Sequence, residues 1–475
     1  MSVAVEDALR AWQRPQHSVA ASPRESAESR PAPVSALPSE LTENPQLSDY
    51  IRAALERNPD VRAAAANVEA RLARIPQVTS LPDPLVRALV RPEPVQTAVG
   101  DVFFTLGVSQ MIPTPAKLDR AGRAAAAEVR MAIAQLNAAR VRVIADVEHA
   151  YYALYLAERL TELTATSRAL LEDLERVVSL RYEVGQVHQQ DVLRVQMAIT
   201  QTQDDEHAYK LRRASAAAAL NRVLNRAVTD HVAPVSSLHS AAWPADTDEL
   251  LQLAETRNPE LARLTQQIAR DREKWELAKL GYWPDVTVGI EWNYLKGRTA
   301  FRPPPNAQTG ITPPYNRASE GGDDNWALMV QMNVPLWMRR IEGAKREARQ
   351  DLLKTEHALE SARAAVAFRI YDAWARVEAQ RHTVDLLSGT LIPQARQTYD
   401  ITVAAYQGGD TDFLSVIDSW RRWLDFELML HRETVDLQTA FSELQREVGV
   451  QLVEQSTALG SAVDSATPAA ADSEE

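Results

Sequence analysis

The sequence predicts a mainly α-helical protein with a small β part, built from two similar halves of one chain. Three observations support this fold class. Short motifs recur in the same order, several segments alternate apolar and polar residues, and very long segments keep a helical pattern without a break. A repeat length of roughly 200 residues is too long for a solenoid of small units, so two large equivalent halves are the simpler interpretation.

The recurring motifs mark corresponding positions in the two halves. Arg57-Asn58-Pro59-Asp60 returns as Arg257-Asn258-Pro259-Glu260, Gln110-Met111-Ile112-Pro113 as Met332-Asn333-Val334-Pro335, and Tyr182-Glu183-Val184-Gly185 as Tyr406-Gln407-Gly408-Gly409. The spacing grows along the chain, mostly because of a Pro/Gly-rich insertion between Leu295 and Asn325.

The predicted domain boundaries follow these motifs. We expect a disordered N-terminal segment at 1–46, a first repeat at 47–228, a linker at 229–247, a second repeat at 248–455 and a disordered tail at 456–475. Both ends are dominated by small, polar and charged residues, which cannot bury enough apolar surface to order a chain. Residues 1–46 also lack the apolar core of a secretory signal, and no stretch is apolar for long enough to form a transmembrane helix.

Each repeat has the same expected layout. A short helix comes first, over 47–57 and 248–257, and an Asn-Pro step then ends it and starts the next helix. Proline suits this place because it has no N–H and tolerates the first helical turn. The strand pairs are expected at 85–111 and 285–334, and the long helices at 115–228 and 336–450.

The strand segments have one apolar face. In 285–294 and 325–334 every second residue is apolar, and such residues share one face of a strand. The candidate lipid-facing residues are Val286, Val288, Ile290, Trp292, Trp326, Leu328, Val330, Met332, Phe104 and Leu106. Segments of about 10 residues with this pattern fit strands of a transmembrane barrel. An ordinary half-buried antiparallel sheet shows the same alternation and is the alternative.

The helical segments are far longer than those of globular proteins. Nothing interrupts the helical pattern over about 117–183, which would reach about 100 Å as a continuous helix. The matching segment 339–406 contains Pro393, which should kink it. Its apolar residues at Val366, Ile370, Ala373 and Val377 follow the four-and-three spacing of a coiled coil. We therefore expect rods of paired helices.

Four strands with one apolar face cannot close a barrel within one chain. Their edges would present unpaired N–H and C=O groups, which hydrocarbon does not satisfy. Three copies would supply twelve strands and a closed wall. Oligomerisation is therefore implied if the apolar face meets the membrane.

Strand pairs that feed long paired helices, duplicated in one chain, resemble the TolC family of outer-membrane efflux proteins. The match spans about Leu47 to Leu452, and its most specific parts are the two Tyr-containing turn motifs followed by Asp191-Val192-Leu193 and Val416-Ile417-Asp418. The resemblance implies a homotrimer with a twelve-stranded barrel in the outer membrane and an α-helical barrel in the periplasm. It also implies a passive exit duct that works with a periplasmic adaptor and an inner-membrane pump of the RND type.

The resemblance further implies a periplasmic gate. Two family aspartates that form a constriction ring correspond to Ser415 and Asp418, so one acid is absent here. Three Asp418 carboxylates around a pore would attract cations, whereas a capping or solvated charge is the alternative role for one aspartate near a helix start. A hydrogen bond between Asp191 and Tyr406 is the expected closed-state latch. Thr411 replaces the arginine of the family's second latch.

The helix turns match the family's adaptor-docking tips. The candidate docking residues are Val184, Gly185, Gln186, Gly408, Gly409 and Asp410. Their simpler role is helix reversal, because glycine readily adopts positive φ. Leu81-Pro82-Asp83-Pro84 and Pro335-Leu336-Trp337 resemble the heavy-metal branch of the family, although no His, Cys or Met cluster supports metal handling.

Composition argues against other classes of protein. The net charge is −12 and no basic stripe stands out, so we expect no nucleic-acid partner. There is no cysteine, which removes disulfides, thiol catalysis and a lipid-anchor cysteine. No catalytic motif, metal site or cofactor motif is recognisable. The basic residues Arg339, Arg340, Lys345 and Arg346 are expected to form a solvated collar near the membrane boundary.

The leading hypothesis is therefore a trimeric outer-membrane exit duct with a periplasmic extension. The alternative is a non-channel coiled-coil scaffold with a small soluble sheet, and an enzyme ranks third. A duct should require detergent and behave as a trimer, whereas a scaffold would be soluble without detergent.

Overall fold

The computed structural model describes residues 45–97, 100–235, 238, 246–296, 308–310 and 323–450. The disordered ends predicted at 1–46 and 456–475 fall almost entirely outside these residues. The described part is mainly helical with one four-stranded sheet, as the sequence predicts. It divides into two compact units. The described residues of unit 1 lie in 69–131 and 265–357, and those of unit 2 in 45–68, 132–264 and 358–450.

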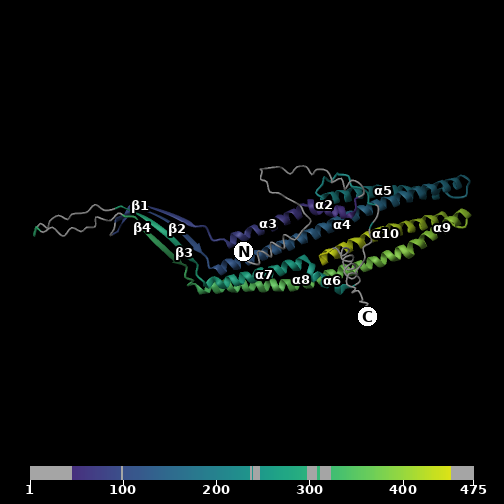
Figure 1. Ribbon diagram of the computed structural model, residues 1–475. Coiled ribbons are helices and arrows are strands. Elements are labelled where there is room, and N and C mark those ends of the chain that lie inside the picture. Colours follow the sequence, from purple (N-terminus) through teal and green to yellow (C-terminus); the bar gives the residue numbers. More distant parts are fainter. Residues whose placement is uncertain are drawn as a thin grey trace, which may run out of the picture. The chain divides into compact units, whose positions relative to one another are not determined.

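The elements follow the predicted order in both halves (Figure 1). The first half contains α2 (Leu47–Arg57), α3 (Pro59–Thr79), β1 (Leu85–Thr97), β2 (Gly100–Ile112), α4 (Pro115–Glu183) and α5 (Gln189–Val223). The second half contains α6 (Thr247–Arg257), α7 (Pro259–Lys279), the 3-10 turn η2 (Leu280–Tyr282), β3 (Val286–Lys296), β4 (Asn325–Met332), α8 (Met338–Leu386), the π-helical turn η4 (Leu387–Leu391), α9 (Ile392–Gly408) and α10 (Phe413–Val448).

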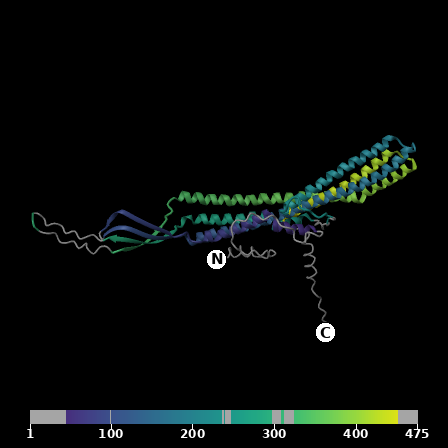
Figure 2. The same cartoon turned by 90° about the horizontal axis from the view of Figure 1, so that it is seen from above.

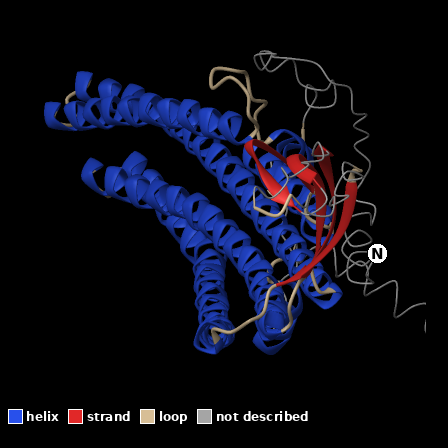
Figure 3. Ribbon diagram, turned by 90° about the vertical axis from the view of Figure 1, so that its left-hand side faces the viewer, coloured by secondary structure: helices blue, strands red, loops and turns tan. Residues whose placement is uncertain are grey.

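Unit 1 contains one sheet, drawn in red in Figure 3. It is antiparallel, with strand order β1-β2-β3-β4. Its register pairs Val86 with Val108, Leu106 with Trp292, and Ile290 with Leu328. Since side chains alternate along each strand, the residues of these pairs share one face with the apolar residues two positions away from them. In the part of the chain that the structure describes, this face is exposed, and the Leu328 side chain, for example, is 76% exposed. The predicted alternation is therefore present, and the apolar side is the exposed one.

The opposite face carries a hydrogen-bonded row across all four strands. Arg91 Nη1 donates to Thr105 Oγ1 at 2.9 Å, Thr105 donates to Asn293 Oδ1 at 2.6 Å, and Asn293 Nδ2 donates to Asn325 Oδ1 at 2.9 Å. Thr105 is buried in this row. An ordinary half-buried sheet covers its apolar face and exposes its polar face, so this sheet is inverted.

The helical segments of unit 1 pack side by side. Arg74 of α3 pairs with Glu128 of α4 at 3.1 Å. Arg120 of α4 pairs with Glu273 of α7 at 2.8 Å. Thr355 of α8 donates to the buried Asp271 of α7 at 2.8 Å. These contacts connect α3, α4, α7 and α8 in that order.

Unit 2 consists mainly of two long helix pairs. In the first pair, Arg168 of α4 reaches Glu206 of α5 at 3.2 Å. In the second pair, Tyr399 of α9 stacks on Trp423 of α10 with ring centroids 5.6 Å apart. Trp420 Nε1 of α10 donates to Ser167 Oγ of α4 at 3.0 Å and joins the two pairs through a buried contact. No helix among the described residues is both long and apolar enough to cross a bilayer.

The long rods are present, with one modification. Helix α4 runs for 69 residues without interruption, as its sequence predicts. The matching segment of the second half changes from α8 into the π-helical turn η4 directly before Pro393. Proline removes a backbone donor, and its ring clashes with the carbonyl four residues earlier, so the ladder widens at this point. The expected kink therefore takes the form of a π turn.

The repeated Asn-Pro motif joins the short helices of unit 2 to the ends of the long ones. Asn58 Nδ2 donates to Val223 O at the end of α5, and Asn258 Nδ2 donates to Glu447 O at the end of α10. Each asparagine also accepts a hydrogen bond from a backbone N–H two residues later, at 2.9 Å in both halves. Both side chains are buried. The motif therefore caps one helix while it fixes the end of another.

Candidate functional site

The candidate site lies at the two helix turns of unit 2, where α4 meets α5 and α9 meets α10. Both views show the two turns at the same end of their helix pairs (Figure 1, Figure 2). Gly185 has φ +75° and Gly409 has φ +88°, values that favour glycine. Gln186 N–H donates to Arg181 O, and Asp410 N–H donates to Ala405 O, which closes both helices with the same Schellman bond. The local reversal is thus set by glycine in each half.

The six candidate docking residues are exposed on these turns. They are Val184, Gly185, Gln186, Gly408, Gly409 and Asp410. The Val184 side chain is 68% exposed. Exposure makes these residues available to another molecule, and a docking role stays a prediction.

Arg181 connects the two turns, and the sequence interpretation did not include it. Its Nη1 donates to Tyr406 O at 2.8 Å and its Nη2 donates to Gln407 O at 2.6 Å. Its guanidinium carbon lies 4.7 Å from the centre of the Tyr406 ring. The last carbonyls of a helix have no partner within the helix, so Arg181 of α4 stabilises the end of α9 from a neighbouring element. Its only signal in the sequence is a basic residue one position before the first Tyr-containing motif.

Tyr406 is 3% exposed, and its ring packs edge-to-face on Phe413 with centroids 5.6 Å apart. Its hydroxyl is buried and has no hydrogen-bond partner among the described residues. Burial raises the pKa of this hydroxyl, while the neighbouring Arg181 opposes the change. Burying a hydroxyl without a hydrogen-bond partner costs free energy. An arrangement that gives the Tyr406 hydroxyl a partner would therefore be more favourable.

The expected hydrogen bond between Asp191 and Tyr406 is absent from this structure. The Asp191 carboxylate instead accepts from the His188 backbone N–H at 3.4 Å and lies 3.5 Å from Arg194. It is therefore the second partner of a capping box at the start of α5. These donors lie in its own turn and satisfy Asp191 locally. Its part in a closed-state latch stays a prediction.

The residues after the second turn divide into a cap and an exposed acid. Asp412 accepts from Ser415 N–H at 3.1 Å and from Ser415 Oγ at 2.6 Å, and these bonds lower the pKa of its carboxyl. Ser415 therefore completes the N-cap of α10. Asp418 is exposed and makes no hydrogen bond or ion pair with another described residue. Thr411, which lies in the chain between α9 and α10, is half-buried.

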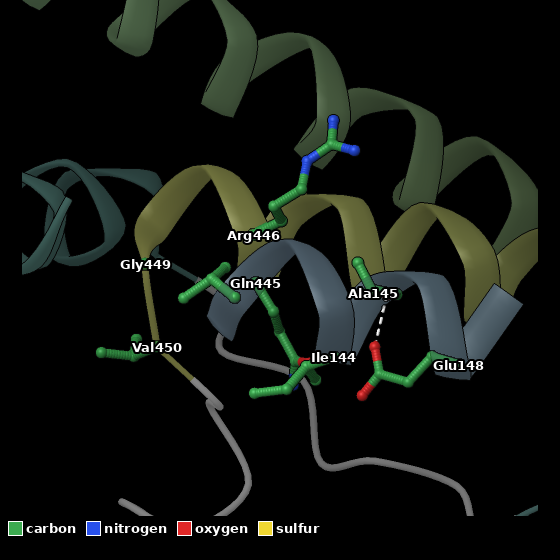
Figure 4. A pocket seen from close by; sticks show the side chains of 9 residues that line it. Ile144, Ala145, Glu148, Gln445, Arg446, Gly449 and Val450 are labelled. Atoms are coloured by element: carbon green, nitrogen blue, oxygen red, sulfur yellow. Dashed lines mark hydrogen bonds between the residues drawn. The ribbon is translucent and has the colours of Figure 1, made fainter. Parts of the chain in front are cut away.

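A pocket of about 200 Å³ lies elsewhere in unit 2, between α4 and the end of α10 (Figure 4). Glu148 lines it and is 6% exposed, and Ser442 Oγ donates to its carboxylate. Burial raises the pKa of Glu148, although the Ser442 hydrogen bond opposes the change. The other lining residues are mostly apolar, apart from Gln445 and Arg446. In the part of the chain that the structure describes, no group of three or more acidic or histidine side chains is placed to hold a metal ion.

Both the sequence and the fold are similar to those of known proteins. The family model of outer membrane efflux proteins matches residues 50–226. The fold matches the outer-membrane channel OprN at TM-score 0.70 and 18% identity, over 86% of this chain and 91% of that chain. The resemblance to outer-membrane efflux proteins is confirmed. A comparison with curated proteins found no match.

Two further channels of known structure have the same fold as this chain. VceC from Vibrio cholerae matches at TM-score 0.69 and 17% identity, over 85% of this chain and 96% of that one. CmeC from Campylobacter jejuni matches at TM-score 0.68 and 14% identity, over 94% and 97%. The predicted fold class, long helices with a four-stranded sheet, is therefore that of the TolC-like channels.

Proposed function

We propose that the protein is a trimeric outer-membrane channel and the exit duct of a tripartite efflux system. The inverted sheet of unit 1 is the observation that carries this proposal. Its exposed face is apolar on all four strands, and its other face is joined by hydrogen bonds between polar side chains. Hydrocarbon on one side and water on the other would stabilise such a sheet. The family match over residues 50–226 and the shared channel fold support the same conclusion.

The four strands also support the trimer. In the described sheet β1 and β4 are edge strands, since each pairs with one neighbour. An edge in hydrocarbon leaves backbone N–H and C=O groups without partners, which is strongly unfavourable. Pairing β1 of one copy with β4 of the next removes both edges. Three copies would then close a wall of twelve strands around a water-filled lumen.

The long helices of unit 2 support a periplasmic extension. The α4–α5 and α9–α10 turns, which expose Val184 and Asp410, would form the end of this extension away from the outer membrane. A periplasmic adaptor would dock there. The inner-membrane pump, of the RND type, would supply the energy and select the cargo. The duct itself would conduct passively and carry out no catalysis. The family consists of channel proteins, which supports this part of the proposal.

Purification followed by bilayer recording tests the proposal. We expect the protein to be extracted only with detergent, to have the mass of three chains, and to give ion conductance in a planar bilayer. A mass measurement on the detergent complex and a conductance histogram report the two properties separately. A detergent-free, soluble chain without conductance would instead support the coiled-coil scaffold and would overturn the duct.

A further inference from the structure

A second exposed apolar surface lies in unit 1, where the sheet joins α7 and α8. We call it the junction patch, and it consists of Tyr282, Trp283, Val334, Leu336, Trp337 and Met338. Trp283 is 62% exposed and Trp337 is 78% exposed. The two sides of the patch are connected, because the Tyr282 hydroxyl donates to Glu342 and the Asp285 N–H donates to the Asn333 side chain. So many large exposed apolar side chains in one place mark an interaction surface.

The junction patch follows the exposed face of the sheet directly along the chain. Strand β4 ends at Met332, and Val334 and Leu336 come two and four residues later. Both are exposed, at 63% and 72%. Tryptophan rings at the end of an apolar band are typical of the level where hydrocarbon gives way to lipid headgroups.

The chain next to the junction patch is basic, although the protein as a whole has a net charge of −12. The segment 338–349 holds five basic and two acidic residues. Arg339 and Arg340 are exposed, and neither makes an ion pair with another described residue. The first turn of α8 contains no acidic residue that would offset them. Two guanidinium groups without an ion-pair partner among the described residues therefore follow the exposed Trp337 by two and three positions in the chain.

The equivalent place in the first half is different. At the start of α4 the cations are paired within unit 1. Lys117 pairs with Asp285 at 2.8 Å, Arg120 with Glu273 at 2.8 Å, and Arg123 with Asp119 at 2.9 Å. Among the described residues, arginines without an ion-pair partner thus occur at the β4–α8 connection, whereas these three cations at the β2–α4 connection are paired.

We propose that the junction patch, together with Arg339 and Arg340, binds the headgroup of an anionic phospholipid. This inference depends on the proposed membrane function. The apolar side chains would lie among the first methylenes of the acyl chains, and the guanidinium groups would donate to the phosphate oxygens. Arginine suits this task because its planar fork matches two phosphate oxygens at once. The patch therefore binds anionic lipids in preference to neutral lipids, at the end of the sheet where β4 leads into α8.

Quenching of tryptophan fluorescence tests this proposal. The trimer is reconstituted into phosphatidylcholine vesicles that contain a small, fixed fraction of lipid with brominated acyl chains. The difference between the wild type and Trp337→Phe isolates the signal of Trp337. We expect brominated phosphatidylglycerol to quench Trp337 more strongly than brominated phosphatidylcholine, with an enrichment of about fivefold for each arginine. The double variant Arg339→Gln/Arg340→Gln should lose this preference.

Arg421→Gln/Arg422→Gln is the matched control, because it removes two adjacent exposed arginines from α10. It should keep the lipid preference. Equal quenching by both lipids, or a preference unchanged in Arg339→Gln/Arg340→Gln, would overturn the lipid site. Absence of quenching by either lipid would mean that a second copy of the chain covers Trp337, which also overturns it. These three outcomes leave the duct intact if the trimer inserts and conducts, whereas failure to insert overturns the proposed function itself.

Discussion

At the scale of single residues, Asn58 and Asn258 do the same work in the two halves. Each side chain is buried and makes hydrogen bonds both to the end of a long helix and to the start of the next one. Asn58→Ala would leave Val223 O and Asp60 N–H without these partners. We expect a loss of about 1–3 kcal/mol in the free energy of unfolding, measured as a lower melting temperature of the detergent-solubilised protein.

Asn67→Ala is the control for this prediction. Asn67 lies on α3, the helix that begins directly after Asn58, and its amide makes one 3.3 Å bond to Gln135 at the surface. Surface substitutions of this kind usually change stability by less than about 0.5 kcal/mol. Equal melting temperatures for the two variants would contradict the role of Asn58.

Arg181 is the second residue with a consequence beyond its own turn. Its two bonds reach the Tyr406 and Gln407 carbonyls of α9. We expect Arg181→Ala to free the α9–α10 turn and to raise the fraction of time the channel is open in bilayer recordings. Arg176→Ala is the control, because Arg176 is exposed on the same helix and pairs locally with Asp173. An open fraction equal to that of the control would exclude Arg181 from the gate.

The sequence predicted the glycine turns of the candidate site, but it did not predict the contact that Arg181 makes between them. The glycines of both turns are local signals, because a left-handed residue is required where the helix reverses. In this structure donors within its own turn satisfy Asp191, and its predicted bond to Tyr406 in a closed state stays a prediction. The Arg181 contact joins residues far apart in the sequence, and no local pattern reports which arginine meets which carbonyl.

At the scale of elements, the hydrogen-bonded row ties the four strands together. Thr105 is its centre, since it accepts from Arg91 and donates to Asn293. Thr105→Val keeps the shape and removes both bonds, so it should lower the temperature at which the trimer dissociates on a denaturing gel. The expected cost is about 1–3 kcal/mol in each chain. Thr287→Val on β3 is the control, because the Thr287 hydroxyl makes no hydrogen bond with another described residue. A trimer as stable as the control would show that the row is dispensable.

The contact between α4 and α10 gives a pH-dependent prediction. Burial raises the pKa of Glu148 above its ordinary value of 4.5. A raised pKa means that the folded protein favours the protonated carboxyl, so ionisation of Glu148 destabilises the fold as pH rises through that pKa. Glu148→Gln stays neutral and keeps an acceptor for Ser442. We expect it to melt at a higher temperature than the wild type at pH 7, with a difference that shrinks as the pH approaches 4.5. A difference independent of pH would contradict the burial argument.

The elements themselves were largely readable from the sequence. Strict alternation located the strands, because a strand places every second side chain on the exposed apolar face. A helical pattern without a break over about 117–183 predicted α4, and Pro393 predicted the kink. The π form of that kink was not predictable, since it depends on how the neighbouring helices hold both sides of the break. Alternation alone does not say which face of the sheet is covered, so the expectation that the apolar face is exposed depended on the barrel interpretation.

At the scale of the whole molecule, the proposed trimer would bring single exposed acids together in a ring. Asp418 is exposed on α10 and has no partner among the described residues. Threefold symmetry around a pore would bring three such carboxylates together, and their summed field would hold multivalent cations. We expect Asp418→Ala to weaken block by a trivalent cation about tenfold in bilayer recordings. Asp425→Ala is the matched control, because Asp425 is also exposed on α10 and should leave the block unchanged. If the two variants are blocked alike, Asp418 lies outside the constriction and is a solvated charge near a helix start.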